Sequence, residues 1–302
     1  MLIFADMLSA KPFVKWAGGK GQLLGEIRKK YPAELGIHIK KYAEPFVGGG
    51  AVLFDILNNF KLDEFYISDI NKELINAYVV VRDSVDALID VLFDFQNKYI
   101  SSSEERRKEF YYDKREKYNA LKKVGYNTSV EIAALFIFLN RTCFNGLYRV
   151  NSKGNFNVPQ GKYNNPSICD EKNLAVSSKK LQRVNIVHSD YKLSTSFIDD
   201  KTFVYFDPPY RPLSSTSSFT FYSENGFCDN KQIDLAKFIN EMSERGAYIL
   251  ASNSDPKNTD EGDDFFERLY ANHQISRIEA SRAINSNRAR RGKINELLIA
   301  SI

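Results

Sequence analysis

Cysteine and histidine are scarce in this chain of 302 residues. Its 3 cysteines, Cys143, Cys169 and Cys228, form no CxxC pair, and its 3 histidines are scattered, so the spacing argues against a zinc site and against a disulfide framework. We therefore expect no metal cofactor and a reducing compartment, the cytoplasm.

Long hydrophobic runs are also missing. The longest apolar run, from Ala133 to Leu139, is far too short for a transmembrane helix. Met1 to Ala10 contains Asp6 and lacks a basic start followed by a long apolar core, so we expect neither a signal peptide nor a membrane partner.

A large excess of one charge is absent as well, because the net charge is only +4. Binding to nucleic acid therefore has to be argued from where the charges lie and not from their sum. Hydrophobic residues make up 43% and charged residues 26% of the chain, which is typical of a folded protein with one large or two smaller domains.

The most informative stretch is Asp207-Pro208-Pro209-Tyr210, which follows a short apolar run, 202–206, that predicts a buried strand. The prolines end the strand and hold the preceding residues extended. Asp207 and the Pro208 carbonyl can accept hydrogen bonds from an exocyclic amino group, while Tyr210 offers a flat face for a ring. The combination suits a nucleobase flipped out of a helix, although an ordinary turn that closes a strand has the same composition.

Two glycine-rich turns lie in the amino-terminal part of the chain. The first, Trp16 to Lys20, precedes a helical pattern over 22–30, and it can present free N–H groups to an anion. The second, Tyr42 to Gly50, reads as strand, turn and then a helix over 51–57. Its F-x-G-x-G spacing at Phe46, Gly48 and Gly50 is associated with S-adenosylmethionine, but a tight turn between a strand and a helix would give a similar cluster.

Acidic residues end two further predicted strands. Asp69 follows the strand 65–68, about 20 residues after the glycine turn, where a carboxylate in an α/β fold binds a ribose diol. Asp190 follows a strand that begins at Val184, and its carboxylate suits the amino group of a cofactor adenine. A third strand is expected over 247–253, after a helix over 233–242.

Between Asn71 and Pro166 the pattern becomes helical, with a buried helix over 131–140. Residues 141–161 then alternate short predicted strands with glycine-containing turns, which indicates a hairpin rich in basic, amide and aromatic side chains. Arg149 can pair with a guanine edge, Leu147 and Pro159 can meet a thymine methyl, and Phe144 can wedge between bases. A plain surface hairpin remains the alternative.

Two features near the carboxyl end also suit nucleic acid. A Ser/Thr-rich loop, 213–220, follows the Asp207 motif and can close over a substrate. Before a last predicted strand, 297–302, lies a basic cluster that suits phosphate contacts, although a solvated loop is an alternative: Arg277, Arg282, Arg288, Arg290, Arg291 and Lys293.

In this order, the motifs resemble the Dam-type DNA adenine-N6 methyltransferases of class alpha. The resemblance runs from about residue 11 to residue 302. It rests on KWAGGK, EPFVGGG, SDIN, FNGLYRVNSKGNFNVP, DPPY with PLSSTSSFT, and RRGKINELL.

The resemblance implies roles for individual residues. It implies that the catalytic motif is Asp207, Pro208, Pro209 and Tyr210. It implies an S-adenosylmethionine site formed by Trp16, Lys20, Glu44, Phe46, Gly48, Asp69, Asp190 and Asp207. It implies a DNA-binding set of Lys15, Phe144, Asn145, Leu147, Arg149 and Pro159, with GATC as the target, whereas Tyr148 and Val150 stand where family members vary.

The fold class that we predict is α/β, a Rossmann-like S-adenosylmethionine-dependent methyltransferase sheet with an inserted helical, hairpin-bearing target-recognition domain. The expected boundaries are 1–70 and 167–302 for the two parts of the methyltransferase domain and 71–166 for the insertion. The expected partner is double-stranded DNA, with a cognate restriction endonuclease acting on the same site as a further possibility. A bacterial, archaeal or phage origin is expected. An N4-cytosine methyltransferase and a non-catalytic DNA-binding regulator are the alternatives.

Overall fold

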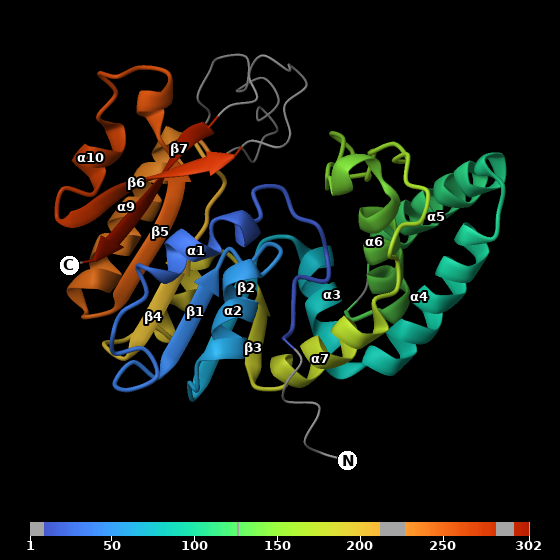
Figure 1. Cartoon of the computed structure of the whole chain (residues 1–302), viewed down its shortest axis with the longest axis horizontal. Helices are drawn as coiled ribbons and strands as arrows, with labels where there is room; N and C mark the ends of the chain where they lie inside the picture. The colour runs from blue at the N-terminus through green and yellow to red at the C-terminus, as the bar shows by residue number, and fades with distance from the viewer. Residues whose placement is uncertain (1–8, 126, 212–226, 282–292, 302) are drawn as a thin grey trace. The chain divides into compact units, whose positions relative to one another are not determined.

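The computed structural model describes residues 9–125, 127–211, 227–281 and 293–301 (Figure 1). The predicted substrate-closing loop, 213–220, lies outside the described residues. The same holds for part of the predicted basic cluster, namely Arg282, Arg288, Arg290 and Arg291.

The chain divides into two compact units. The first unit contains Met1–Gly19, Gly48–Asn59 and Asp69–His188, and the second contains Lys20–Val47, Phe60–Ser68 and Ser189–Ile302. These units interleave along the sequence and do not follow the predicted functional boundaries at 70 and 166, which stay a prediction.

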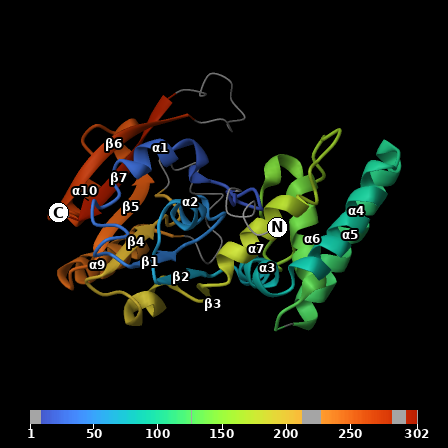
Figure 2. The same cartoon turned by 60° about the horizontal axis from the view of Figure 1, so that its bottom comes forward.

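The first unit is mainly helical (Figures 1 and 2). Its elements are α2 (Ala51–Asn59), α3 (Lys72–Asp83), α4 (Val85–Ile100), α5 (Glu104–Val124), α6 (Val130–Thr142), η3 (Phe144–Gly146), α7 (Glu171–Leu181) and β3 (Val184–His188). Side-chain caps fix where several helices begin, because Asn71, Ser103 and Ser129 each accept a hydrogen bond from the backbone N–H three residues later.

Helix α6 forms the core of the first unit. It is apolar on all sides, and residues 132–140 are all buried. Both views show α4, α5 and α6 lying side by side. A helix that is hydrophobic all round is stable only when other elements cover it, so the prediction of a buried helix here is confirmed.

The segment after α6 differs from its prediction. In place of short strands, Phe144–Gly146 forms a 3-10 turn, and pairing is limited to the isolated bridges Cys143↔Gln160 and Val150↔Phe156. Glycines with positive φ at Gly146 and Gly154 turn the chain out of the extended conformation, so no continuous ladder forms. The antiparallel course of the predicted hairpin is nevertheless present.

The second unit is built on a sheet. The strands are β1 (Lys41–Pro45), β2 (Glu64–Asp69), β4 (Thr202–Phe206), β5 (Tyr248–Ser254), β6 (His273–Ser281) and β7 (Lys293–Ser301). Within the described residues the sheet order is β3-β2-β1-β4-β5-β7-β6, and all of it except β3 and the last residue of β2 belongs to this unit. The helical elements of this unit are η2 (Lys20–Gln22), α1 (Leu24–Arg28), η4 (Tyr191–Ser196), α9 (Asp229–Glu244), η5 (Pro256–Asn258) and α10 (Phe265–Leu269).

Strand β4 is the centre of this sheet. All five of its residues are buried, and it pairs in parallel with β1 on one side and β5 on the other. The strand order β3-β2-β1-β4-β5 means that successive strands are added on one side of β1 and then, from β4, on the other side. The carboxyl ends of the strands at such a switch point are the usual place for ligands in α/β folds. Asp207 leaves the sheet at this point.

The predicted α/β class is confirmed, and the predicted strand 202–206 matches β4 residue for residue. Strand β6 was not predicted. It pairs antiparallel with β7, in a register that includes Ile275↔Ile299. Pairing with this distant strand therefore stabilises a segment in which apolar and polar residues alternate only weakly.

Candidate active site

Asp207 is held by two side chains of the second unit. The Lys20 ammonium lies 2.8 Å from Oδ1 of Asp207, and the Ser252 hydroxyl donates a hydrogen bond of 2.8 Å to the same oxygen. The Lys20 side chain is 5% exposed and that of Asp207 21%, so the lysine is covered while the carboxylate remains accessible. Since η2 carries Lys20 and β5 carries Ser252, residues from two elements fix the carboxylate.

The Tyr210 ring is also fixed in place. The Lys20 ammonium lies 4.7 Å from the centre of the Tyr210 ring, and the Tyr210 hydroxyl donates a 2.7 Å hydrogen bond to Glu296 on β7. Burial, together with the charges of Asp207 and Glu296, raises the pKa of Tyr210 well above its usual value. The phenol therefore stays a proton donor, and both ends of the ring are anchored.

Side chains of α9 and β5 hold the backbone of the 207–211 turn. Gln232 donates to the Pro209 carbonyl at 3.0 Å, and Asn253 in turn donates to Gln232 at 3.0 Å. The Asn253 side chain also accepts from the Arg211 N–H at 3.1 Å, and Ser254 donates to the Arg211 carbonyl at 2.8 Å. Prolines cannot donate to a sheet ladder, so these side chains replace the missing backbone bonds.

The Arg211 side chain ties the turn to two acidic residues. Its guanidinium lies 2.9 Å from Asp229 and 2.6 Å from Asp263, and it stacks 4.2 Å from the centre of the Phe265 ring. These contacts join the residue after the turn to the start of α9 and to the segment before α10. The turn is therefore fixed at its carboxyl end as well as along its backbone.

In the first unit, Gly48 connects Trp16 with Asp69. The backbone of Gly48 has φ +48°, and a Cβ atom at this position would lie 2.7 Å from Cδ1 of Trp16. Its N–H donates to Oδ2 of Asp69 at 3.2 Å, while Oδ1 accepts from the Asn71 N–H at 2.9 Å. Glycine is thus required both by the backbone angle and by the indole packed against it.

Burial raises the pKa of Asp69, while the hydrogen bonds from the Asn71 and Gly48 N–H groups oppose that shift. Two N–H donors leave further lone pairs on the carboxylate, so the group can still accept from a diol. Gly50, with φ +71°, supports the same turn, because the Tyr78 hydroxyl fills the space of a Cβ there and donates to the Gly48 carbonyl at 3.1 Å.

The remaining predicted cofactor residues lie in the second unit. Phe46 stacks on Tyr191 with 5.5 Å between ring centres, and Tyr191 directly follows the exposed Asp190. Glu44 is only 2% exposed and accepts a 2.7 Å hydrogen bond from the Tyr42 hydroxyl. Its carboxylate is therefore part of a buried polar pair and not of an open surface.

Six predicted DNA-binding residues lie in the first unit, and backbone contacts connect several of them. The Phe144 N–H donates to the Pro159 carbonyl at 2.9 Å, and both side chains are exposed. Lys15 packs its aliphatic stem against Gly146, where an added Cβ would lie 2.5 Å from Cδ of the lysine, and its ammonium lies 4.3 Å from the centre of the Tyr163 ring.

Arg149 is exposed, and its Nε donates to Asn157 at 2.8 Å, which orients the guanidinium. Asn145 adopts φ +55° and is exposed at the turn, while Leu147 is half-buried. Arg277 of the predicted basic cluster is already paired with Asp255 and Glu267, so it offers less charge to a phosphate than its sequence context suggests.

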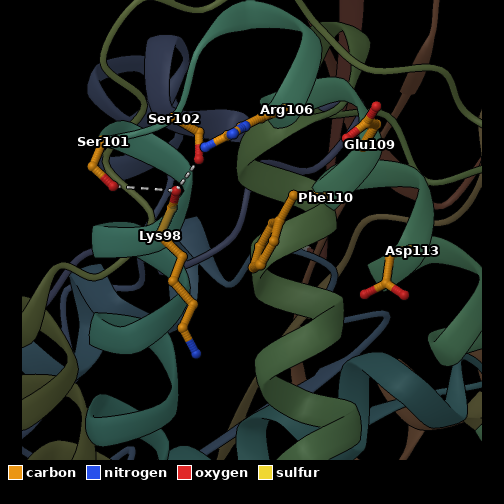
Figure 3. A pocket seen from close by; sticks show the side chains of 7 residues that line it. All are labelled: Lys98, Ser101, Ser102, Arg106, Glu109, Phe110 and Asp113. Carbon is orange, nitrogen blue, oxygen red and sulfur yellow. Dashed lines mark hydrogen bonds between the residues drawn. The ribbon is translucent and has the colours of Figure 1, made fainter.

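The described residues offer neither a metal-binding cluster nor a membrane-spanning helix. No group of three or more His, Cys, Asp or Glu side chains that could hold a metal ion occurs in them, and none of their helices is long and apolar enough to cross a membrane. A hollow between α4 and α5 is lined by Lys98, Ser101, Ser102, Arg106, Glu109, Phe110 and Asp113 (Figure 3). It contains none of the predicted site residues, and both serine hydroxyls are used at the end of α4.

Comparison with known sequences decides the family. Residues 16–284 match the sequence model of the D12 class of N6 adenine-specific DNA methyltransferases. The chain belongs to this family. The match includes the glycine turns, the 144–160 segment and the Asp207 motif, so the predicted family is confirmed, as are the enzyme class and the methyltransferase sheet.

Relatives support the same assignment over nearly their whole length. The chain is 48% identical over 294 residues to the Type II methyltransferase M.MjaIII of Methanocaldococcus jannaschii, which covers 97% of this chain and 99% of the relative. It is 35% identical over 302 residues to the Type II methyltransferase M1.LlaDCHI of Lactococcus lactis subsp. cremoris, covering 99% and 98%. It is 34% identical over 292 residues to the DNA adenine methylase of Escherichia coli K12, covering 97% and 95%.

For this methyltransferase, sequence reasoning missed the side chains that hold the 207–211 turn. They are Ser252, Asn253, Gln232 and Glu296. Asn253 ends a strand that was predicted, and Glu296 belongs to the RRGKINELL motif, so the signals were present. Their roles depend on the pairing of β4 with β5 and of β5 with β7, which a single sequence does not specify.

Proposed function

We propose that this protein transfers a methyl group from S-adenosylmethionine to N6 of an adenine that is flipped out of duplex DNA, within the sequence GATC. Membership of the adenine-specific family favours N6 of adenine over N4 of cytosine, and enzyme over regulator. The observation that carries the proposal is the accessible Asp207 carboxylate, held by Lys20 and Ser252.

The chemical difficulty lies in the adenine amino group, whose lone pair is conjugated with the ring. The Asp207 carboxylate and the Pro208 carbonyl accept hydrogen bonds from its two hydrogens, which favours a pyramidal nitrogen with an available lone pair. The Tyr210 ring stacks on the base, and its anchoring by Lys20 and Glu296 supports a fixed orientation.

When bound, S-adenosylmethionine supplies an electrophilic methyl group on its sulfonium. When the amino nitrogen gains the methyl group it becomes positively charged, and it must then lose one of its two protons. We propose that Asp207 stabilises this charge and accepts that proton. The Lys20 ammonium, 2.8 Å from the carboxylate, and the Ser252 hydroxyl keep the carboxylate oriented before that step.

The residues present fit this cofactor. In the first unit, Gly48 allows close approach of the backbone, Asp69 retains acceptor capacity for the ribose hydroxyls, and Trp16 offers an aromatic face. In the second unit, we assign Asp190 to the adenine amino group and Phe46 to the wall of its pocket. Lys20, Glu44 and Asp207 are assigned to the amino-acid end of the cofactor, with Glu44 buried near the end of β1.

For DNA, we assign base reading to Lys15, Leu147, Arg149 and Pro159, and we place Phe144 and Asn145 beside the position left by the flipped adenine. The proposal of GATC rests on the resemblance of these residues to the Dam-type set. Two relatives carry the name Type II methyltransferase, which supports a pairing with a restriction endonuclease of the same specificity. We place the protein in the cytoplasm, where the DNA is.

Incubation of the purified protein with S-adenosylmethionine that carries a labelled methyl group and with unmethylated DNA tests the function. We expect the label in N6-methyl-2'-deoxyadenosine after digestion to nucleosides, measured by mass spectrometry. Label in N4-methylcytosine, or no label at all, contradicts the proposal. A duplex in which GATC is replaced by GTAC is the control for sequence specificity and should remain unlabelled.

Arg149 carries the prediction about specificity. Arg149→Ala should weaken discrimination at one guanine by about 1–3 kcal/mol, the usual value for a bidentate arginine, with a smaller effect on nonspecific affinity. Methylation rates on duplexes with single-base changes in GATC measure it. Asn157→Ala, which removes the acceptor that orients Arg149, should shift the same base preference less. An unchanged base preference in Arg149→Ala would show that Arg149 does not read a base.

A further inference from the structure

Tyr148 lies between two proposed base readers, Leu147 and Arg149, but has different neighbours. Its ring stacks on Trp16, with 5.8 Å between ring centres and 23° between planes. The buried rings of Phe136 and Phe156 lie 5.7 Å and 5.8 Å away. Arg149 is exposed, whereas the Tyr148 ring is packed among these aromatic side chains.

The Tyr148 hydroxyl is tied to two helices. It donates to Glu73 at the start of α3 at 3.1 Å, and it accepts from the Lys122 ammonium in the last turn of α5 at 3.1 Å. Lys122 and Glu73 also form an ion pair of 3.3 Å, with both side chains 14% exposed. Burial and the Glu73 charge raise the pKa of Tyr148, so the hydroxyl stays protonated and keeps donating.

Trp16 also contacts the glycine-rich turn at Gly48, which we propose to bind the cofactor. Trp16 packs so closely on Gly48 that a Cβ there would lie 2.7 Å from the indole. Gly48 in turn donates to Asp69. A continuous set of contacts inside the first unit therefore leads from the segment with the proposed base readers, through Tyr148 and Trp16, to the glycine turn.

We propose that Tyr148 is a positioning residue that couples binding of DNA to binding of S-adenosylmethionine. The inference rests on the proposed function and adds a regulatory role that nothing in the reaction itself requires. DNA that seats Leu147 and Arg149 fixes the backbone of residue 148, and the tyrosine ring then holds Trp16 against Gly48. A cofactor that orders Trp16 fixes Tyr148 in return, because coupling between two binding sites is reciprocal.

The experiment uses the single tryptophan of the protein. Because Trp16 is the only one, intrinsic fluorescence reports this contact without a label. The dissociation constant for S-adenosylmethionine is measured by fluorescence titration with and without a GATC duplex. Wild type is compared with Tyr148→Leu, which removes the ring, and with Tyr148→Phe, which removes only the hydroxyl. Tyr112→Phe is the matched control, since the Tyr112 ring packs edge-to-face with Tyr111 and makes no ring contact with Trp16.

In wild type we expect the duplex to tighten cofactor binding by a factor of about 5 or more, within the usual range for coupled sites. In Tyr148→Leu this factor should fall below about 2 and the Trp16 emission should shift, while Tyr148→Phe should be intermediate and Tyr112→Phe unchanged. If circular dichroism shows that Tyr148→Leu does not fold, Tyr148→Phe tests the inference. The factor by which the duplex tightens cofactor binding should then be lower in Tyr148→Phe than in wild type.

Two outcomes overturn the inference alone. One is a wild type that binds both ligands without mutual effect, and the other is a Tyr148 variant that keeps the full factor. A wild type that binds neither S-adenosylmethionine nor DNA instead overturns the proposed function, and the inference with it. The two failures are therefore distinguishable in the wild-type titrations.

Discussion

Alanine in place of Asp207 abolishes methyl transfer while duplex DNA still binds. The carboxylate is the accessible acceptor at the end of β4, and alanine removes both the acceptor and the negative charge that faces the developing positive nitrogen. Loss of one preorganised electrostatic group of this kind typically lowers the rate by about 10²–10³, and loss of the proton acceptor adds to it, so we expect a decrease of at least about 10³ in kcat.

Six other residues are proposed to bind the DNA and Asp207 is proposed to contact only the flipped adenine, so DNA affinity should change little. Single-turnover methylation and a gel-shift titration measure the two effects separately. Turnover near that of wild type in Asp207→Ala would refute the proposed role.

Asp207→Asn and Ser252→Ala are the matched controls. Asparagine keeps the size and one acceptor oxygen but loses the charge, so we expect it to be as inactive as alanine and more stable. Alanine at Ser252 removes the hydrogen bond to Asp207 and the 3.0 Å hydrogen bond with the buried Tyr205 hydroxyl, each worth about 0.5–1.5 kcal/mol, but it leaves the Asp207 carboxylate in place. Thermal unfolding is needed alongside, because Asp207→Ala removes the carboxylate that pairs with the buried Lys20.

The second large effect is expected at Gly48. Gly48→Ala forces an alanine into φ +48°, which costs about 1–2 kcal/mol, and brings its methyl group to 2.7 Å from the Trp16 indole, which adds about 1–3 kcal/mol of overpacking. Because the clash moves either Trp16 or the turn that donates to Asp69, cofactor affinity should fall by at least about tenfold. Titration of S-adenosylmethionine and the unfolding midpoint measure the two consequences.

Gly125→Ala separates strain from contact. Gly125 also has a positive φ, +82°, but a Cβ there has no heavy atom within 4 Å. It should lose stability through the backbone angle alone and bind the cofactor as wild type does. If Gly48→Ala behaves like Gly125→Ala in both measurements, the indole contact has no part in cofactor binding.

Some elements of this protein follow from local sequence, and others depend on residues distant in the chain. Strand β4 was predicted residue for residue because five consecutive aromatic and β-branched residues followed by two prolines permit little else. The 141–161 segment was expected to form strands and did not, because Gly146 and Gly154 take positive φ and turn the chain out of the extended conformation. At Gly146 the space of a side chain is occupied by the Lys15 stem, which is distant in the sequence.

Tertiary structure also changed how some charges are understood. The resemblance assigns Glu44 to the cofactor site, which stays a prediction, and the structure adds that its carboxylate is buried and accepts a hydrogen bond from Tyr42. Arg277 looked free for a phosphate and is paired with Asp255 and Glu267. A sequence gives the charge of a side chain, whereas its partners come from elements distant in the chain.

The sequence by itself determined the family and the α/β class and predicted the chemical groups of the proposed active site, because these depend on short motifs whose backbone and side-chain chemistry is local. Only the tertiary structure decided that Lys20 and Ser252 hold Asp207, that Glu296 and Lys20 anchor Tyr210, and that Tyr148 packs on Trp16. Each of these contacts joins residues that are far apart in the sequence, and such pairs become neighbours only when strands pair and helices pack.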